Sequence, residues 1–160
     1  MSCHPCITSL VDYGFEAEQK LTLAMSDALQ QPLIKTTGTF DSMDFMSSEV
    51  FVELKRRGLD FCYHDVKIKE EGWLMPSCKV MKGWSELAEG KRVYFFYFWS
   101  FDKSLWVYEM KPGDFTEPGS HTVPKYHFDK MLHVKIPQDS WTFVKTLDEL
   151  VLEEEQCWIE

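Results

Sequence analysis

The chain has 160 residues, of which 44% are hydrophobic and 15% aromatic, a composition that indicates one folded domain and excludes a disordered chain. Its formal net charge of -9 argues against non-specific binding of a polyanion by the chain as a whole. The sequence contains no apolar stretch of bilayer length and no secretory signal at its start, so we expect a cytoplasmic protein without a membrane partner.

Charge is distributed unevenly along the chain. Residues 53–92 contain nine Lys or Arg against seven acids, whereas residues 147–160 contain six acids and no base. A local basic surface on an acidic protein is therefore possible, although an ordinary solvated surface would give the same counts. The five cysteines have irregular spacings, which argues against a disulfide framework and for a reducing compartment.

The elements can be predicted in chain order. Residues 12–30 are predicted to form a helix, because Ala17, Leu21, Ala24 and Ala28 recur at helical spacing. Strands are expected in residues 37–45, 49–57, 92–99, 104–110 and 131–136, a helix capped by Ser77 in residues 78–90, and a short helix in residues 147–155. This order predicts an α/β or α+β fold with a mixed central sheet flanked by helices. We expect a single domain with a core at 12–110 and a C-terminal extension at 111–160 that ends in an acidic tail.

The first two predicted strands contain the charged residues Asp44, Glu53 and Lys55 at positions that suggest a site. Because side chains alternate across a strand, Glu53 and Lys55 share one face while Val52 and Leu54 share the other. Asp44 stands nine residues before Glu53, so it can reach Glu53 across the ladder if the two strands are neighbours. Two carboxylates held together repel each other, and a hard divalent cation such as Mg²⁺ or Mn²⁺ removes that repulsion. On the preceding helix, Glu18 lies beside the apolar stripe and is the acid expected to face inward.

These residues resemble the PD-(D/E)XK nuclease superfamily, through the motif Asp44…Glu53-Leu54-Lys55 and the preceding helix that carries Glu18. The resemblance covers about residues 12–110 and implies an αβββαβ core with the restriction-endonuclease-like fold. It further implies that Asp44, Glu53 and the Leu54 carbonyl bind Mg²⁺ or Mn²⁺, that Lys55 is the catalytic lysine and that Glu18 is an accessory acid.

The motif departs from the family pattern at one position, since Met43 stands where the family has a proline. Asp41 is an alternative to Asp44, because the loop length in this family varies. Lys79 and Lys82 on the second helix, together with Arg57, are expected to contact phosphates of the nucleic acid.

The resemblance implies hydrolysis of phosphodiester bonds in DNA, or less often RNA, by a compact enzyme, and we expect a homodimer because one such domain cuts one strand. Small nucleases of this kind occur in phages and large viruses, where the location would be the host cytoplasm. Two alternatives stay open: a nuclease-fold protein without activity that serves as a protein-interaction module, and a nuclease directed at RNA.

Overall fold

The computed structural model describes the backbone of residues 4–35, 44–59, 61–65, 73–115, 122–124 and 132–150, and the side chains of 17–35, 45–59, 61–65, 73–115 and 133–150. The elements of the first half are α1 (His4–Leu29), β1 (Ile34–Lys35), β2 (Asp44–Met46), β3 (Val50–Arg57), β4 (Trp73–Pro76) and α3 (Ser77–Ala88). Those of the second half are β5 (Arg92–Trp99), β6 (Ser104–Met110), β7 (Thr122–Pro124), β8 (Leu132–Ile136), the 3₁₀ turn η1 (Gln138–Ser140) and β9 (Thr142–Thr146). The predicted mixed α+β fold is confirmed.

The main sheet has six strands in the order β1-β2-β3-β5-β6-β9. Strands β1, β2 and β3 form an antiparallel meander, and β5 then runs parallel to β3 after the crossover that contains α3. Strands β6 and β9 continue the sheet in antiparallel fashion. The first part of the chain therefore has the order of helix, three antiparallel strands, β4 of a second sheet, helix and parallel strand, in which β1 and β4 are strands that the sequence did not predict.

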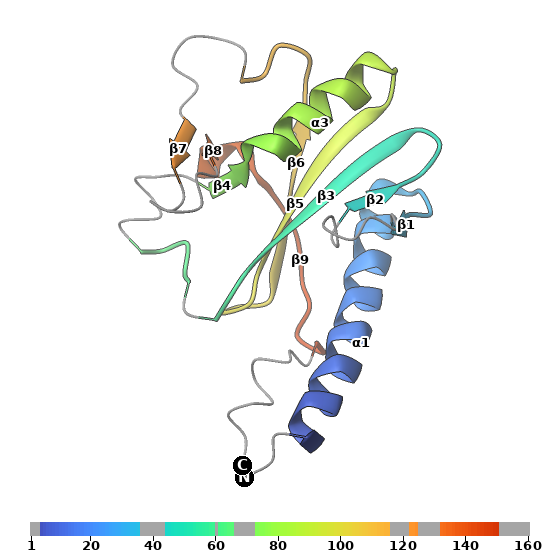
Figure 1. Cartoon of the computed structure of the whole chain (residues 1–160), viewed down its shortest axis with the longest axis vertical. Helices are drawn as coiled ribbons and strands as arrows, with labels where there is room; N and C mark the ends of the chain where they lie inside the picture. The colour runs from blue at the N-terminus through green and yellow to red at the C-terminus, as the bar shows by residue number, and fades with distance from the viewer. Residues whose placement is uncertain are drawn as a thin grey trace.

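The two helices cover opposite faces of the main sheet (Figure 1). Alternation along β5 divides its residues between two buried clusters, as expected for a strand that is apolar throughout. The cluster on the α1 side contains Ala17, Leu21, Ala24, Met25, Val50, Val52, Leu54, Tyr94, Phe96 and Phe98. The cluster on the α3 side contains Phe51, Trp73, Met75, Val80, Val93, Phe95, Tyr97, Trp99, Met110 and Trp141.

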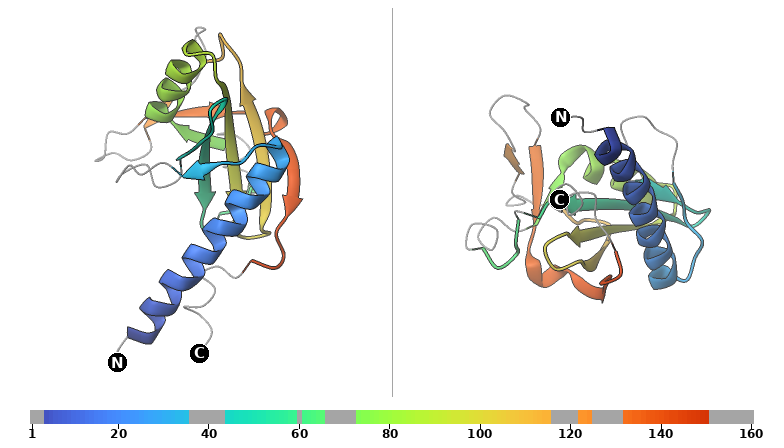
Figure 2. Two further views of the ribbon diagram at one scale, coloured as in Figure 1. Left: turned by 90° about the vertical axis from the view of Figure 1, so that its right-hand side faces the viewer. Right: turned by 90° about the horizontal axis from the view of Figure 1, so that it is seen from below.

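The described side chains of helix α1 that pack on the sheet belong to its second half. Figure 2 shows that its N-terminal end projects past the ends of the strands. The buried stripe is formed by Ala17, Leu21, Ala24 and Met25, while Ala28, which the sequence placed in the stripe, is exposed. Neither helix is long and apolar enough to cross a membrane, as far as the described residues go.

Residues beyond 110 belong to both sheets. Strand β9 pairs with β6 at the edge of the main sheet, and Leu147 and Leu150 are buried in the α1-side cluster. Strand β8 pairs with β4 and β7 in a second sheet with the order β4-β8-β7. The described part of the predicted C-terminal extension is therefore integral to the fold. The acidic tail at 151–160, and with it most of the helix expected at 147–155, lies outside the described residues.

Helix α3 approaches the sheet closely because of a glycine. A Cβ atom on Gly83 would lie 2.8 Å from Met110 Sδ and 3.3 Å from Val93 Cγ1, so a larger residue would have to displace the Met110 side chain. The helix ends before Gly90, whose φ of 89° suits the residue that follows a helix. The prediction that Ser77 caps the helix was wrong, because Ser77 is its first residue and Pro76 occupies the cap position. Among the described residues, no side chain forms a capping hydrogen bond at the start of α3.

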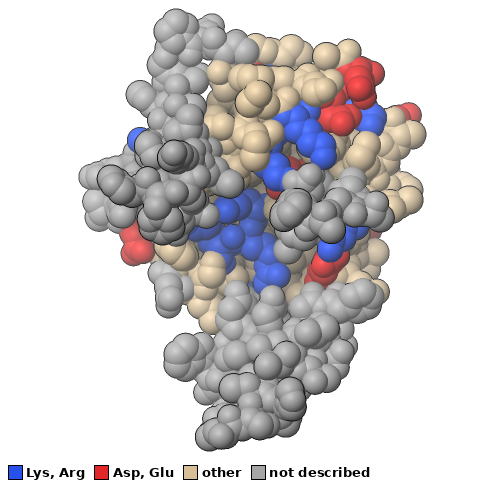
Figure 3. Space-filling view, viewed as in Figure 1, with Lys and Arg blue, Asp and Glu red and all other residues tan. Residues whose placement is uncertain are grey.

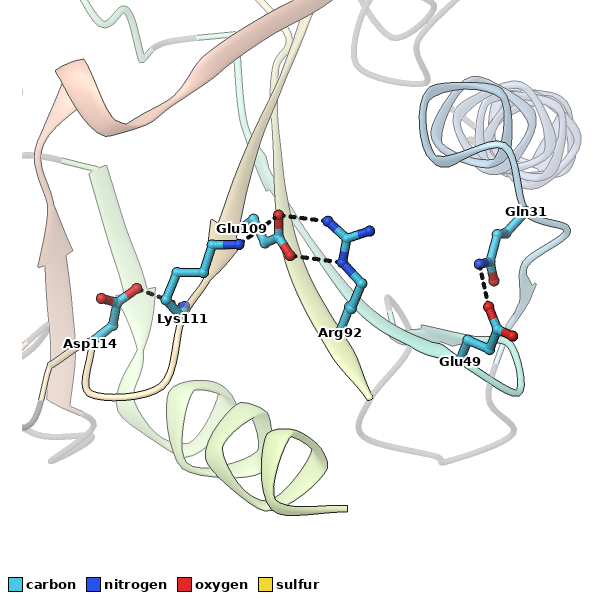
Figure 4. A network of polar contacts seen from close by, with 6 residues as sticks. All are labelled: Gln31, Glu49, Arg92, Glu109, Lys111 and Asp114. Atoms are coloured by element: carbon cyan, nitrogen blue, oxygen red, sulfur yellow. Dashed lines mark hydrogen bonds and ion pairs between the residues drawn. The ribbon is translucent and has the colours of Figure 1, made fainter. Parts of the chain in front are cut away.

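The β5–β6 pair is tied at its open end by an ion-pair network (Figure 4). Arg92 Nε and Nη2 donate to the two carboxylate oxygens of Glu109 at 2.9 and 3.0 Å, and Lys111 Nζ lies 3.1 Å from the same carboxylate. The hydrogen bond from Arg92 is the main cause that lowers the pKa of Glu109. This bidentate contact secures the strand that lies next to β3.

Candidate functional site

Glu53 is the centre of the candidate site. It lies in β3 opposite Phe95 of β5, on the α3 face of the sheet, and only 5% of the residue is exposed. Its Oε2 atom accepts no hydrogen bond from the described residues. The nearest cation among the described ion pairs is Lys79 of α3, whose Nζ lies 3.5 Å from that oxygen. Burial of an ionised carboxylate is costly without a counterion, so Lys79 stabilises Glu53 where it stands.

The close approach of α3 explains how Lys79 reaches the carboxylate. Lys79 and Gly83 are four residues apart and therefore share one face of the helix. Gly83 brings this face against β5, and Lys79, one turn earlier, then extends over β3. Its side chain is only 14% exposed, so the ion pair is shielded from solvent.

Asp44 is the register partner of Glu53. Strand β2 pairs antiparallel to β3 with Asp44 opposite Glu53, Phe45 opposite Val52 and Met46 opposite Phe51. The condition that the sequence left open, that the two strands are neighbours, is met at the level of the backbone. The side chain of Asp44 lies outside the described residues.

The other residues of the predicted motif occupy defined positions. Lys55 is half-buried and follows Glu53 on the same face, opposite Tyr97 of β5. The Leu54 side chain is buried in the α1-side cluster, so only its backbone carbonyl is available as a ligand. Asp41 and Met43 lie outside the described residues.

Glu18 is not brought to Glu53, contrary to the expectation from the helical wheel. It forms an ion pair with Lys35 of β1, with 2.7 Å between Nζ and Oε1. Helix α1 covers the face of β3 that carries Val52 and Leu54, whereas Glu53 points to the α3 face. A helical wheel gives a residue's direction relative to its own helix and does not tell which sheet face the helix covers, which is why the prediction failed.

A basic face surrounds Glu53 on the α3 side of β3 and consists of Lys55, Arg57, Lys79 and Lys82. Figure 3 shows Lys and Arg side chains gathered at the centre of the face that carries α3 and β3. Lys82 Nζ lies 5.1 Å from the centre of the Phe51 ring, and the Arg57 guanidinium lies 4.2 Å from the centre of the Phe61 ring. Within the side chains that the structure describes, no three of His, Cys, Asp and Glu cluster as metal ligands would.

Two features of this region were missed by sequence reasoning. The Glu53–Lys79 ion pair joins a strand to a helix, and no local pattern signals it. The turn after β3 presents Phe61 and inserts Tyr63, whose O–H donates to Asp102 Oδ2 at 2.6 Å. Burial, and then this hydrogen bond, raise the pKa of Tyr63 to about 12.

Comparison with known proteins adds no assignment: no family model, no curated protein and no solved structure matches the chain.

Proposed function

We propose that the chain is a metal-dependent nuclease that hydrolyses phosphodiester bonds in DNA. The observation that carries the proposal is the register of β2 on β3, which sets Asp44 opposite Glu53, with Lys55 two residues further along the face of Glu53. Within the main sheet, the order of helix, antiparallel meander, helix and parallel strand supports it, because the motif's family implies that order; β4, which precedes α3, belongs to the second sheet.

The chemistry of Glu53 fits a divalent cation. Its buried Oε2 accepts no hydrogen bond from the described residues, and hard carboxylate oxygens suit Mg²⁺ or Mn²⁺. Asp44 and Glu53 would hold the ion, with the Leu54 carbonyl as a further oxygen ligand. Such an ion, when bound, makes a coordinated water more acidic and polarises a phosphate.

The lysines supply positive charge where the reaction creates negative charge. Lys55 would donate to the phosphate oxygens as charge develops on them, and its half-buried position strengthens that interaction relative to water. Lys79 would balance the carboxylates before the cation binds. Lys82 and Arg57 would contact phosphates on either side of the scissile bond without reading sequence.

The proposal is tested by calorimetry with Mn²⁺ and by cleavage of a panel of single-stranded, duplex and branched DNA and of RNA. We expect Glu53→Gln to lose metal binding and cleavage together, and Lys55→Ala to lose cleavage while it still binds metal. Glu49→Gln is the matched control, because Glu49 is an exposed carboxylate in the β2–β3 turn that accepts a hydrogen bond from Gln31 (Figure 4). Cleavage of no substrate with either metal would overturn the proposal, and cleavage of RNA alone would change its substrate.

A second candidate is a nuclease-fold protein without activity that binds a protein partner. The Glu53–Lys79 ion pair favours it, because it neutralises the buried carboxylate without a metal. Under this alternative the wild-type chain shows no heat of Mn²⁺ binding, and Glu53→Gln does not differ from it.

A further inference from the structure

The turn that follows β3 holds an aromatic ring in solvent beside the candidate site. Phe61 is 43% exposed, although it is a large apolar side chain. The Arg57 guanidinium, from the last residue of β3, lies 4.2 Å from the centre of its ring. We call this pair of side chains the Phe61 platform.

The platform is anchored on both sides. Leu59 packs against the α1-side cluster, and the Phe61 N–H donates to the Gly58 carbonyl at 3.1 Å. Tyr63 packs edge-on against the rings of Trp99 and Phe101, with centroids 5.3 and 5.0 Å away. Its hydrogen bond to Asp102 ties the turn to the β5–β6 connection. Because Leu59 and Tyr63 are held in place on either side of it, the Phe61 side chain stays exposed. A ligand that binds the Phe61 ring therefore needs to order little of the chain.

The chemistry of the platform fits an unpaired base with its phosphate. An exposed aromatic ring stacks on any nucleobase, and an arginine beside it can contact the phosphate or stack in turn. Arg57 is the fourth residue after Glu53 along β3, a distance of about 13 Å at the usual rise of a strand. Lys55 lies between them on the same face, so positive charge is continuous from the platform to the candidate site.

We infer that the Phe61 platform binds an unpaired nucleobase of single-stranded DNA and directs the strand along β3 toward Glu53. In a duplex the base faces are stacked on one another, so the platform selects single strands or frayed ends. This inference rests on the proposed function, since it names the form of DNA that the same site takes.

The test is fluorescence anisotropy with labelled single-stranded and blunt duplex oligonucleotides, measured at low salt with EDTA so that nothing is cleaved. We expect Phe61→Ala to weaken binding of the single strand about 10-fold, in line with the loss of one stacked base, and to leave duplex binding unchanged. Phe61→Trp should retain the affinity for single strands, because it keeps a stacking surface.

Phe143→Ala is the matched control, since Phe143 is a 50% exposed phenylalanine on β9 at the far edge of the sheet, and it should change neither affinity. The inference is overturned if Phe61→Ala binds single strands as tightly as wild type, or if its affinities for single strands and duplex fall equally. It is also overturned if the wild-type chain binds no single strand. The first of these results would instead assign Phe61 to a protein partner. These assays need no metal, so their failure is distinguishable from the loss of Mn²⁺ binding and cleavage that tests the proposed function.

Discussion

Substitution of Lys79 by methionine tests whether the candidate site is electrostatically balanced by α3. The change keeps the length and apolar stem of the side chain and removes its charge. At 3.5 Å and an effective dielectric constant of about 20, the attraction between the Lys79 ammonium and the Glu53 carboxylate is about 5 kcal/mol. Lys55 on the same face and some relaxation of Glu53 offset part of that loss. We therefore expect Lys79→Met to lower the free energy of unfolding by about 3 kcal/mol, at the lower end of the cost of breaking a buried ion pair.

The assay is urea unfolding followed by circular dichroism, supported by thermal melts, in which this loss amounts to a fall in Tm of about 10 °C for a chain of this size. Glu53→Gln in the Lys79→Met background removes the unpaired charge and should restore most of the stability. Lys111→Met is the matched control, because Lys111 is 62% exposed in its ion pair with Glu109 and should cost less than about 1 kcal/mol.

The metal proposal adds a further expected result. A cation bound at Glu53 replaces the missing ammonium, so excess Mn²⁺ should stabilise Lys79→Met by mass action and should have no such effect on the double variant. If Lys79→Met costs no more than the Lys111 control, Glu53 is not a buried charge balanced by α3, and the reasoning fails.

Three other results are expected. Gly83→Ala should lower the free energy of unfolding by about 1 kcal/mol in the same assay. The new Cβ atom must displace the Met110 sulfur, and the cost of this displacement outweighs the gain in helix propensity. An increase in stability would contradict the close packing of α3. Burial raises the pKa of Tyr97 to about 12, and the nearby Arg57 partly opposes this rise. The neutral phenol therefore stabilises the fold fully below pH 10. As pH rises from 10 through 12, the free energy of unfolding should fall by about 3 kcal/mol. Tyr97→Phe should remove this share of the alkaline loss and leave that of Tyr63 when unfolding is measured across that range, and an unchanged pH dependence would show that Tyr97 does not contribute. Arg92→Ala should raise the pKa of Glu109 toward its ordinary value, since the hydrogen bond from Arg92 is the main cause of the lowering; NMR titration of that carboxyl checks it, and an unshifted curve would show that the bidentate contact does not persist in solution.

The regular parts of the fold were predictable because their patterns are local. The apolar run of β5 predicted a central strand buried on both faces, and the alternation in β3 correctly put Glu53 and Val52 on opposite faces. Gly90 marked the end of α3. The edge strand β9 escaped prediction because Thr142–Thr146 is mostly exposed, so its sequence has no apolar alternation to recognise.

The candidate site was predictable only in part. The spacing of Asp44 and Glu53 is compatible with adjacent strands, but it does not determine which residues pair, and the register is a property of the folded sheet. The ion-pair partners of Glu18 and Glu53 could not be predicted from the sequence, because each partner is a lysine on another element. Phe61 had no signal of its own, since the sequence around it does not tell whether an aromatic residue in a turn is buried or exposed.

By itself, the sequence determined the mixed α+β class, the central strands and the set of charged residues on one face of β3. These features follow from the periodicity of hydrophobic residues and from strand alternation, which depend only on residues close together in the sequence. Only the tertiary structure decided that α3, through Gly83, brings Lys79 to Glu53, that α1 covers the other face and takes Glu18 to Lys35, and that the turn after β3 holds Phe61 in solvent. These outcomes depend on contacts between elements distant along the chain, and such contacts follow from packing of the whole core, which no local pattern encodes.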